Sequence, residues 1–244
     1  MKSIKTLSLA VVIISVIFIF TFPQFLRCYF VKLDGFQEMQ PNVFVEKRIS
    51  KKQQDSLKSY VKMAKKRISH FWGKQEGQAK VIFCKNIETY KKYCQSSEGA
   101  GCSIGTPLGS WIILNTDGLN IDVIAHEMCH DELMTKLGWW KTKKTIPTWF
   151  DEGLALMLDY RFVSSQDSIQ RYIDYQTELN YLSPQPIPLD ELKTQKQFFV
   201  QDQLFIKIAY FSSAAAISKK ISIKGRKEIF SIIEKVKKEG EFEF

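Results

Sequence analysis

The sequence predicts an α+β fold: a small mixed sheet packs on a helix that carries two histidines, a mainly helical part follows, and an N-terminal transmembrane helix precedes them. Three observations lead to this prediction. Residues 7–22 form an apolar run without a charge. Residues 80–84 and 110–116 are short apolar runs, as expected of buried strands. Much of the remaining chain has apolar residues at helical spacing.

The composition bounds the class of protein. The chain has 244 residues, of which 45% are hydrophobic and 25% charged, enough for one packed domain of roughly 200 residues plus an appendage. This apolar content excludes a disordered chain, and 12 Gly with 7 Pro exclude a collagen-like one. Five cysteines are too few for a disulfide scaffold. The net charge of +9 by itself admits nucleic acid or anionic lipid as a partner.

The N-terminal run is long enough to suggest a membrane anchor. About twenty apolar residues span the hydrocarbon core of a bilayer, and residues 7–26 approach that length. A signal-peptide core is the alternative, but no small-residue cleavage site follows. We therefore expect a single-pass membrane protein with an anchor over 1–27, a connector with one short strand over 28–46, and a domain over 47–244 on the extracytoplasmic side.

A basic amphipathic helix is predicted at the start of the domain. Residues 47–67 hold nine Lys or Arg and one acid, and apolar residues recur from Leu57 to Phe71 at helical spacing. Its basic face is either simply solvated or in contact with anionic lipid beside the anchor. Because the sequence has no recognisable nucleic-acid module, we expect no nucleic-acid partner.

The remaining elements follow from apolar runs and turn signals. We expect strands over 80–84 and 110–116, a Gly/Ser-rich loop over 96–109, and helices over 87–94, 120–137, 149–160, 201–219 and 226–238. Gly138 is the predicted stop of the helix that begins near Asn120 or Asp122.

Two of the three histidines, His126 and His130, lie four residues apart on the predicted helix. Residues i and i+4 share a helix face, so both imidazoles can reach one metal ion. Glu127 points about 100° away around the helix axis, beside an open coordination position. This is the HExxH arrangement, in which the glutamate acts as general base on zinc-bound water. The alternative is a pair of histidines that binds no metal.

A third metal ligand is expected from the segment 147–155. Thr148 followed by Asp151 has the spacing of a capping box, which would start a helix here. Glu152 then lies in the first turn, where the helix dipole favours a carboxylate, and Gly153 allows close approach to another backbone. Two histidines and one glutamate leave a fourth position open, as a catalytic Zn²⁺ site requires. The alternative for Glu152 is a solvated first-turn acid.

His126-Glu-Met-Cys-His130 followed by Trp149-Phe-Asp-Glu-Gly-Leu-Ala155 resembles the gluzincin clan of zinc metallopeptidases, most of all the compact peptidase MA-like or minigluzincin domains. The resemblance covers about residues 50–240 and implies a zincin-like fold. It implies that 110–116 is the edge strand along which an extended peptide substrate pairs. It implies that the zinc ligands are His126, His130 and Glu152 and that the general base is Glu127. It also implies that Tyr210 is the candidate donor to the oxyanion; the alternative is that Tyr210 is a core residue.

The sequence departs from this clan at two positions, Leu156 and Cys129. Many gluzincins place an Asp four residues after the ligand Glu to orient the first histidine, and here that residue is Leu156. Asp159 or Asp131 could take this role. Cys129, inside the motif, is expected to be core packing. Cys84, Cys94 and Cys102 lie within nineteen residues. Cys94 could form a disulfide with Cys102, but spacing does not fix the pairing, and a reduced set is the alternative.

We therefore expect a membrane-anchored, zinc-dependent peptidase that acts on peptide or protein substrates. One alternative is a zinc-loaded, non-proteolytic membrane module that binds peptides along its edge strand. Another is a basic membrane-surface adaptor whose histidines are coincidental. Glu127 favours the peptidase, because a binding module needs no general base.

Overall fold

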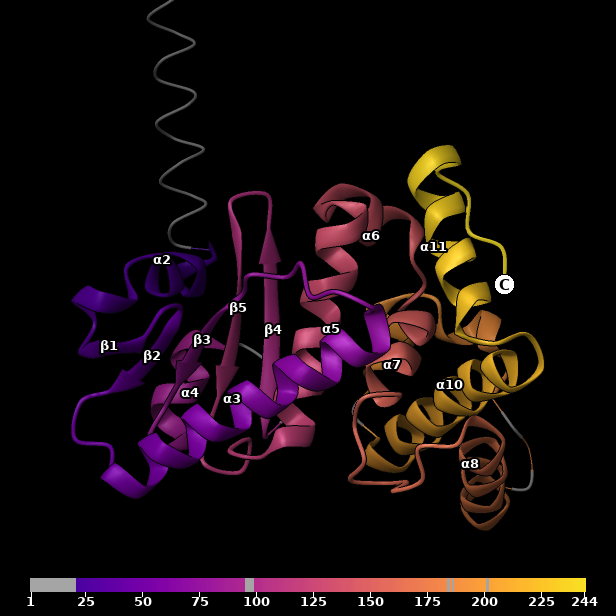
Figure 1. Ribbon diagram of the computed structural model, residues 1–244, viewed down its shortest axis with the longest axis horizontal. Coiled ribbons are helices and arrows are strands. Elements are labelled where there is room, and N and C mark those ends of the chain that lie inside the picture. The colour runs from indigo at the N-terminus through magenta and orange to yellow at the C-terminus, as the bar shows by residue number, and fades with distance from the viewer. Residues whose placement is uncertain (1–20, 95–98, 184, 186, 201) are drawn as a thin grey trace, which may run out of the picture.

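The computed structural model describes residues 21–94, 99–183, 185, 187–200 and 202–244. Figure 1 shows the sheet in one half of the molecule and most of the later helices in the other half. The five strands have the order β1-β2-β3-β5-β4, and the β2–β3 and β3–β5 pairs are parallel while the outer pairs are antiparallel. The strands are β1 (Phe36–Gln40), β2 (Val43–Glu46), β3 (Lys80–Phe83), β4 (Gly101–Thr106) and β5 (Gly109–Leu114).

Side chains that alternate along the strands enter two separate cores. On one face of the sheet, residues such as Val81 and Ile112 join a large core with α3 (Lys51–Trp72) and α5 (Ile121–Leu137). On the other face, Ile82 and Ile113 join a smaller core that includes Tyr90 of α4 (Ile87–Tyr93). The sheet is thus covered by helices on both faces, which explains why its central strands read as continuous apolar runs.

The predicted identity of the edge strand is wrong. Residues 110–114 lie in β5, which is an interior strand between β3 and β4. The edge strand beside β5 is β4, which falls within the predicted loop 96–109, and β1 forms the other edge of the sheet. Its sequence, Gly-Cys-Ser-Ile-Gly-Thr, lacks an apolar run because Gly101 and Gly105 face α5 at close range. A Cβ at Gly101 would lie 2.8 Å from Val123 Cγ1, and a Cβ at Gly105 would clash with Met134 Sδ.

Residues 28–46 also contribute more to the sheet than the predicted connector would. They contain two strands, β1 and β2, rather than one, together with a short 3₁₀ helix, η1 (Val31–Leu33). Strand β2 pairs directly with β3, and Val43 and Val45 are buried in the large core.

The prediction of a transmembrane helix is also corrected. Among the described residues, no helix is both long and apolar enough to cross a membrane. Most of the predicted anchor 7–26 lies outside them, in residues 1–20, and its described part enters α2 (Pro23–Tyr29). Seven residues span roughly 10 Å, against about 30 Å of hydrocarbon. The fold is therefore a mixed α/β arrangement around a five-stranded sheet, without the expected transmembrane helix among the described residues, and a single-pass membrane location is not supported.

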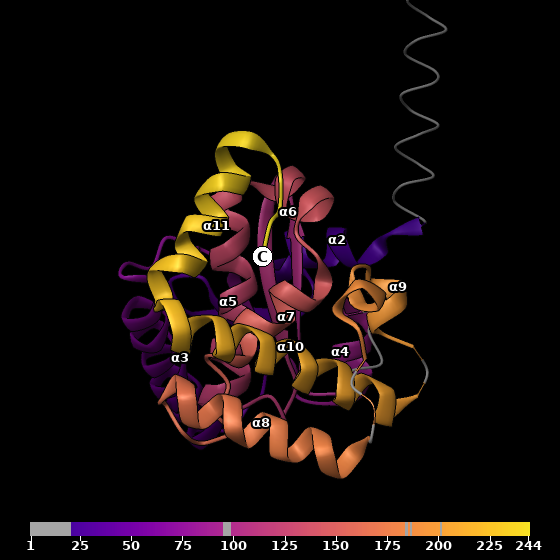
Figure 2. The ribbon, with the colours of Figure 1, turned by 90° about the vertical axis from the view of Figure 1, so that its right-hand side faces the viewer.

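The C-terminal part is helical. Helix α10 packs against α7 and α8 and continues into α11 (Figure 2). The predicted helices 120–137, 201–219 and 226–238 are present within a few residues, whereas α6 and α8 were not predicted. The helices are α6 (Trp139–Thr145), α7 (Thr148–Leu156), α8 (Ser168–Leu182), α9 (Gln195–Phe198), α10 (Gln203–Lys224), α11 (Arg226–Glu239) and the 3₁₀ helix η2 (Leu189–Leu192).

Candidate metal centre

Helix α5 carries both histidines and is fixed at each end as predicted. The side chain of Asn120 accepts a hydrogen bond of 2.8 Å from the Val123 amide, which caps the helix N-terminus. Gly138 adopts a positive φ of 81° where the helix ends. Because α5 packs between the sheet and the later helices, His126 and Glu127 are buried despite their polarity.

Helix α7 presents the third residue of the centre. The helix begins at Thr148 directly after Pro147, and no side chain caps it. The predicted capping box is therefore wrong: Asp151 accepts a hydrogen bond from the His130 ring instead. Gly153 allows α7 to approach α10, since a Cβ there would lie 2.7 Å from the Ser213 carbonyl oxygen.

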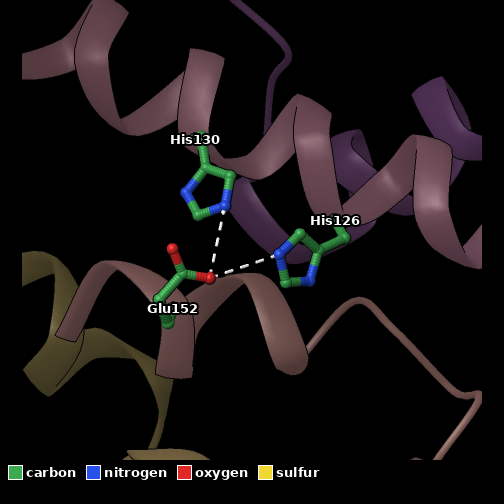
Figure 3. A group of neighbouring side chains, drawn as sticks. All are labelled: His126, His130 and Glu152. Atoms are coloured by element: carbon green, nitrogen blue, oxygen red, sulfur yellow. Dashed lines mark ion pairs between the residues drawn. The ribbon is translucent and has the colours of Figure 1, made fainter. Parts of the chain in front are cut away.

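The two histidines and the glutamate converge at one point (Figure 3). The Oε2 atom of Glu152 lies 3.4 Å from His126 Nε2 and 3.6 Å from His130 Nε2. One potential ligand atom from each residue lies within 4.8 Å of the others. His126, His130 and Glu152 are therefore close enough together to hold a metal ion.

The opposite nitrogen of each imidazole faces a second carboxylate. His130 Nδ1 lies 2.7 Å from Asp151 Oδ1, a hydrogen bond in which the ring N–H donates. His126 Nδ1 lies 3.6 Å from Asp159 Oδ2, which is a close contact but too long for a hydrogen bond. With Nδ1 protonated in both rings, each Nε2 lone pair points toward Glu152, as metal ligation requires.

Asp159 itself is held by arginines. Arg161 makes a bidentate contact with its carboxylate, with Nε 3.0 Å from both oxygens. The buried Arg171 donates hydrogen bonds to the Asp159 and Leu156 carbonyl oxygens and so fixes the turn that follows α7. Asp131, the other candidate, instead accepts hydrogen bonds from Ser110 and the Ala79 amide. Of the two candidate partners of His126, it is therefore Asp159, and not Asp131, that contacts the ring.

The unpaired atoms of the centre fit a cation. Glu152 Oε2 is buried and has no hydrogen-bond donor among the described residues, and its two neighbours are the ring nitrogens. A buried carboxylate oxygen without a donor is costly, whereas a cation shared with two imidazoles would satisfy all three atoms. Two ligand atoms that each lie 2.0–2.2 Å from a tetrahedral ion are roughly 3.4 Å from one another. This separation is close to the distances from Glu152 Oε2 to the Nε2 atoms of His126 and His130.

The surrounding charges shift the pKa of each titrating group. Burial alone would lower the pKa of the His130 ring, but Asp151 and Glu152 raise it to about 9. Burial opposes protonation of His126 in the same way, and Asp159 and Glu152 raise its pKa overall. Burial raises the pKa of the Glu127 carboxyl, with a smaller contribution from the Glu152 charge and opposition from the histidines. The group expected to act as base therefore binds a proton more readily than an exposed glutamate.

Glu127 lies beside the edge strand. A Cβ at Gly101 of β4 would lie 3.2 Å from both Cγ and Oε1 of Glu127. The absence of a side chain at Gly101 thus leaves room for the glutamate between α5 and β4. This packing places the carboxylate at the wall of the cleft that contains the triad.

A cleft of about 750 Å³ opens over the triad. Strand β4 forms one wall through Cys102 and Ser103, and helices α6, α9 and α10 form others. Tyr210 lines this cleft, half-buried, with its ring centroid 6.3 Å from that of His126. The structure therefore brings all five predicted site residues to one cleft, namely His126, Glu127, His130, Glu152 and Tyr210.

The cysteines take two different roles. Cys94 and Cys102 form a disulfide, which was one of the two expected states, and it ties the end of α4 to the edge strand. Cys129 is fully buried in the large core, and burial raises the pKa of its thiol. This location agrees with core packing rather than metal ligation.

Comparison with models of known protein families, with curated proteins and with solved structures returned no match for this chain.

Proposed function

We propose that this protein is a zinc-dependent peptidase, with His126, His130 and Glu152 as metal ligands and Glu127 as general base. The observation that carries the proposal is the convergence of two Nε2 atoms on a buried Glu152 oxygen that has no donor among the described residues. Three protein ligands leave a position open for water or substrate, whereas a structural zinc site is closed by four. The resemblance to gluzincins points to the same ligands and reaction.

The choice of Zn²⁺ rests on the donor set. Two neutral imidazoles and one carboxylate suit zinc, and each histidine has a carboxylate beside its other nitrogen. When bound, a zinc ion would supply a Lewis acid that polarises a peptide carbonyl and makes water more acidic.

The residues around the centre would divide the proton transfers. Glu127 takes a proton from the attacking water and delivers it to the leaving amine. Tyr210, which lines the cleft from α10, is the candidate donor to the carbonyl oxygen as negative charge develops there.

The substrate is proposed to bind along β4 rather than β5. Strand β4 pairs with β5 on one side and is the last strand of the described sheet on the other. Its residues Cys102 and Ser103 line the cleft beside Glu127. An extended peptide added to this edge would pass next to the metal ligands, with backbone hydrogen bonds supplying much of the affinity.

The decisive experiment compares Glu127→Gln with the wild type. The variant should keep stoichiometric zinc, because Glu127 is not a ligand, and lose about 10²- to 10⁴-fold in turnover of a peptide library. Glu178→Gln, on the exposed face of α8, is the matched control and should keep full activity. Zinc analysis and hydrolysis with and without chelator are measured together. Undiminished hydrolysis by Glu127→Gln would show that Glu127 is not the general base. If the wild type bound zinc but hydrolysed no peptide, the protein would be a metal-binding module rather than a peptidase.

A further inference from the structure

Two lysines line the cleft outside the metal centre. Lys143 lies in the last turn of α6 and Lys196 in α9, and both side chains are exposed. In Figure 2, α6 and α9 lie on different sides of α7, the helix that carries Glu152. Lys143 and Lys196 therefore line the cleft from separate elements.

Each acid of the cleft already has a role, whereas the lysines do not. The three carboxylates that line the cleft are Glu127, Asp151 and Glu152, which are the proposed base, the partner of His130 and a proposed ligand. Neither Lys143 nor Lys196 makes an ion pair or a side-chain hydrogen bond with the part of the chain that the structure describes, although the charge of Lys143 helps to lower the pKa of Asp151. Other lysines nearby are engaged: Lys193 lies 2.6 Å from Asp190.

The charge balance of the cleft follows from these roles. Without an ion, the three carboxylates face the two lysines and the two histidine rings, whose pKa values the neighbouring carboxylates raise. With a divalent cation on the triad, the cation and the lysines together outweigh the carboxylates. The other lining residues, apart from the histidines, carry no formal charge, and among them Gln195 and Gln203 offer amide donors. A metal-loaded cleft thus presents a net positive charge to whatever lies along it.

We propose that the cleft selects peptides with a carboxylate close to the cleaved bond, held by Lys143 and Lys196. This inference rests on the proposed peptidase function and adds the substrate class. A carboxylate can come from an Asp or Glu side chain or from the C-terminus of the peptide, and both would meet the same ammonium groups. Because both lysines are exposed, each ion pair between a substrate carboxylate and a lysine should raise affinity or kcat/KM by at most about five-fold. The effect should decrease as the salt concentration rises.

The test uses matched peptides and charge-reversed variants. One series carries Glu, Gln or Lys at a position flanking the cleaved bond, each with an amidated and a free C-terminus. For the wild type loaded with zinc we expect Glu to exceed Gln and Gln to exceed Lys, with the differences reduced at high salt. A preference that depends on the free C-terminus alone would identify the terminal carboxylate as the source.

Variants separate charge recognition from loss of structure. Lys196→Glu should invert the preference, so that the Lys peptide becomes the better substrate, which an unfolded protein cannot do. Lys143→Gln should reduce the preference, with its zinc content measured because Lys143 lies near Asp151, a partner of a ligand. Lys144→Gln, the exposed neighbour that does not line the cleft, should keep the wild-type preference.

Binding of the same peptides to zinc-loaded Glu127→Gln, followed by fluorescence anisotropy, separates this inference from the proposed function. Tighter binding of the Glu peptide without hydrolysis by the wild type would reject the peptidase and keep the acidic preference. Equal binding of Glu and Gln peptides, no binding of either, or an unchanged preference in Lys196→Glu would overturn the inference.

Discussion

At the scale of single residues, the orientation of His126 depends on Asp159. The carboxylate contacts Nδ1 at 3.6 Å and is itself fully buried beside Arg161. We predict that Asp159→Asn lowers zinc affinity by about 10- to 100-fold, because an amide stabilises the Nδ1-protonated imidazole less well than a carboxylate. Competition with a chelator of known affinity measures the change.

The control for this variant is Asp190→Asn, an exposed acid paired with Lys193. It should leave zinc affinity unchanged. Circular dichroism and the melting temperature of Asp159→Asn report whether the Arg161 contact is also needed for folding. Wild-type zinc affinity in a folded Asp159→Asn protein would contradict the assigned role.

The residues of the site differ in how far the sequence could identify them. His126, His130 and Glu127 follow from one local rule, the spacing of residues on a helix. Asp151 was assigned to a capping box because its spacing from Thr148 also satisfies a local rule, and only the approach of α5 brings His130 to it. Asp159 lies beyond the end of α7, so its position depends on a turn held by Arg171, which no periodicity encodes.

At the scale of elements, α7 is held against α10 by the absence of a side chain. A Cβ at Gly153 would lie 2.7 Å from a backbone oxygen and 2.8 Å from Ile217 Cγ1. We predict that Gly153→Ala destabilises the fold by about 1–3 kcal/mol, the usual effect of overpacking, and lowers zinc affinity because Glu152 is the adjacent residue. Denaturant unfolding and zinc titration measure the two effects.

Gly99→Ala is the matched control, since a Cβ at Gly99 has no atom within 4 Å. Its unfolding curve should overlay that of the wild type within error. An equally stable Gly153→Ala protein would show that α7 and α10 can separate without cost.

The edge strand is a second element whose position has an identifiable support. The Cys94–Cys102 disulfide connects the end of α4 to β4, and Cys102 also lines the cleft. We predict that the double variant Cys94→Ser/Cys102→Ser loses roughly 2–3 kcal/mol of stability, as expected for closing so short a loop. Thermal unfolding of the wild type with and without reductant should show the same loss. A melting temperature insensitive to reductant would contradict it.

Strand β4 also shows why part of the fold was not predictable. Central strands such as β3 and β5 are buried on both faces and appear in the sequence as apolar runs. Strand β4 instead has glycines where it meets α5, and glycine-rich sequence normally indicates a loop. The reason for the missing side chains is the close contact with α5, whose contacting residues lie about twenty to thirty positions later in the chain.

At the scale of the whole molecule, the two cores bury every cysteine that is not in the disulfide. Cys28 and Cys84 lie in the smaller core and Cys129 in the larger one. Burial raises the pKa of the Cys28 thiol to about 12 and raises the pKa of the other two above the usual range. A raised pKa lowers the fraction of reactive thiolate at any given pH, so at pH 8 these thiols should react very slowly.

Alkylation followed by mass spectrometry checks this distribution. The native protein should remain unmodified, the denatured protein should gain three adducts without reductant, and five after reduction. Rapid labelling of a native thiol would show that one of the cores opens at low cost, which is the property that global packing is expected to prevent.

The segment that follows α11 packs against α7, the helix that carries the proposed ligand Glu152. Phe242 packs on Phe150 and Trp149 of α7, with ring centroids 4.9 and 5.8 Å apart, and these residues directly precede Asp151. Lys235 holds the segment through an ion pair of 2.6 Å with Glu243. The helix that supplies a ligand is therefore supported from behind by residues almost a hundred positions later in the sequence.

This support predicts that removal of the Phe242 ring weakens both fold and metal binding. We expect Phe242→Ala to lose about 1–3 kcal/mol, from lost burial and aromatic contacts, and to show a smaller increase in melting temperature on addition of zinc than the wild type. Tyr181→Ala removes a ring that is 87% exposed and should change neither quantity. If Phe242→Ala lost stability but kept the full zinc-dependent increase, α7 would hold its ligand geometry without help from the chain that follows α11, and the coupling between these distant segments would be limited to packing.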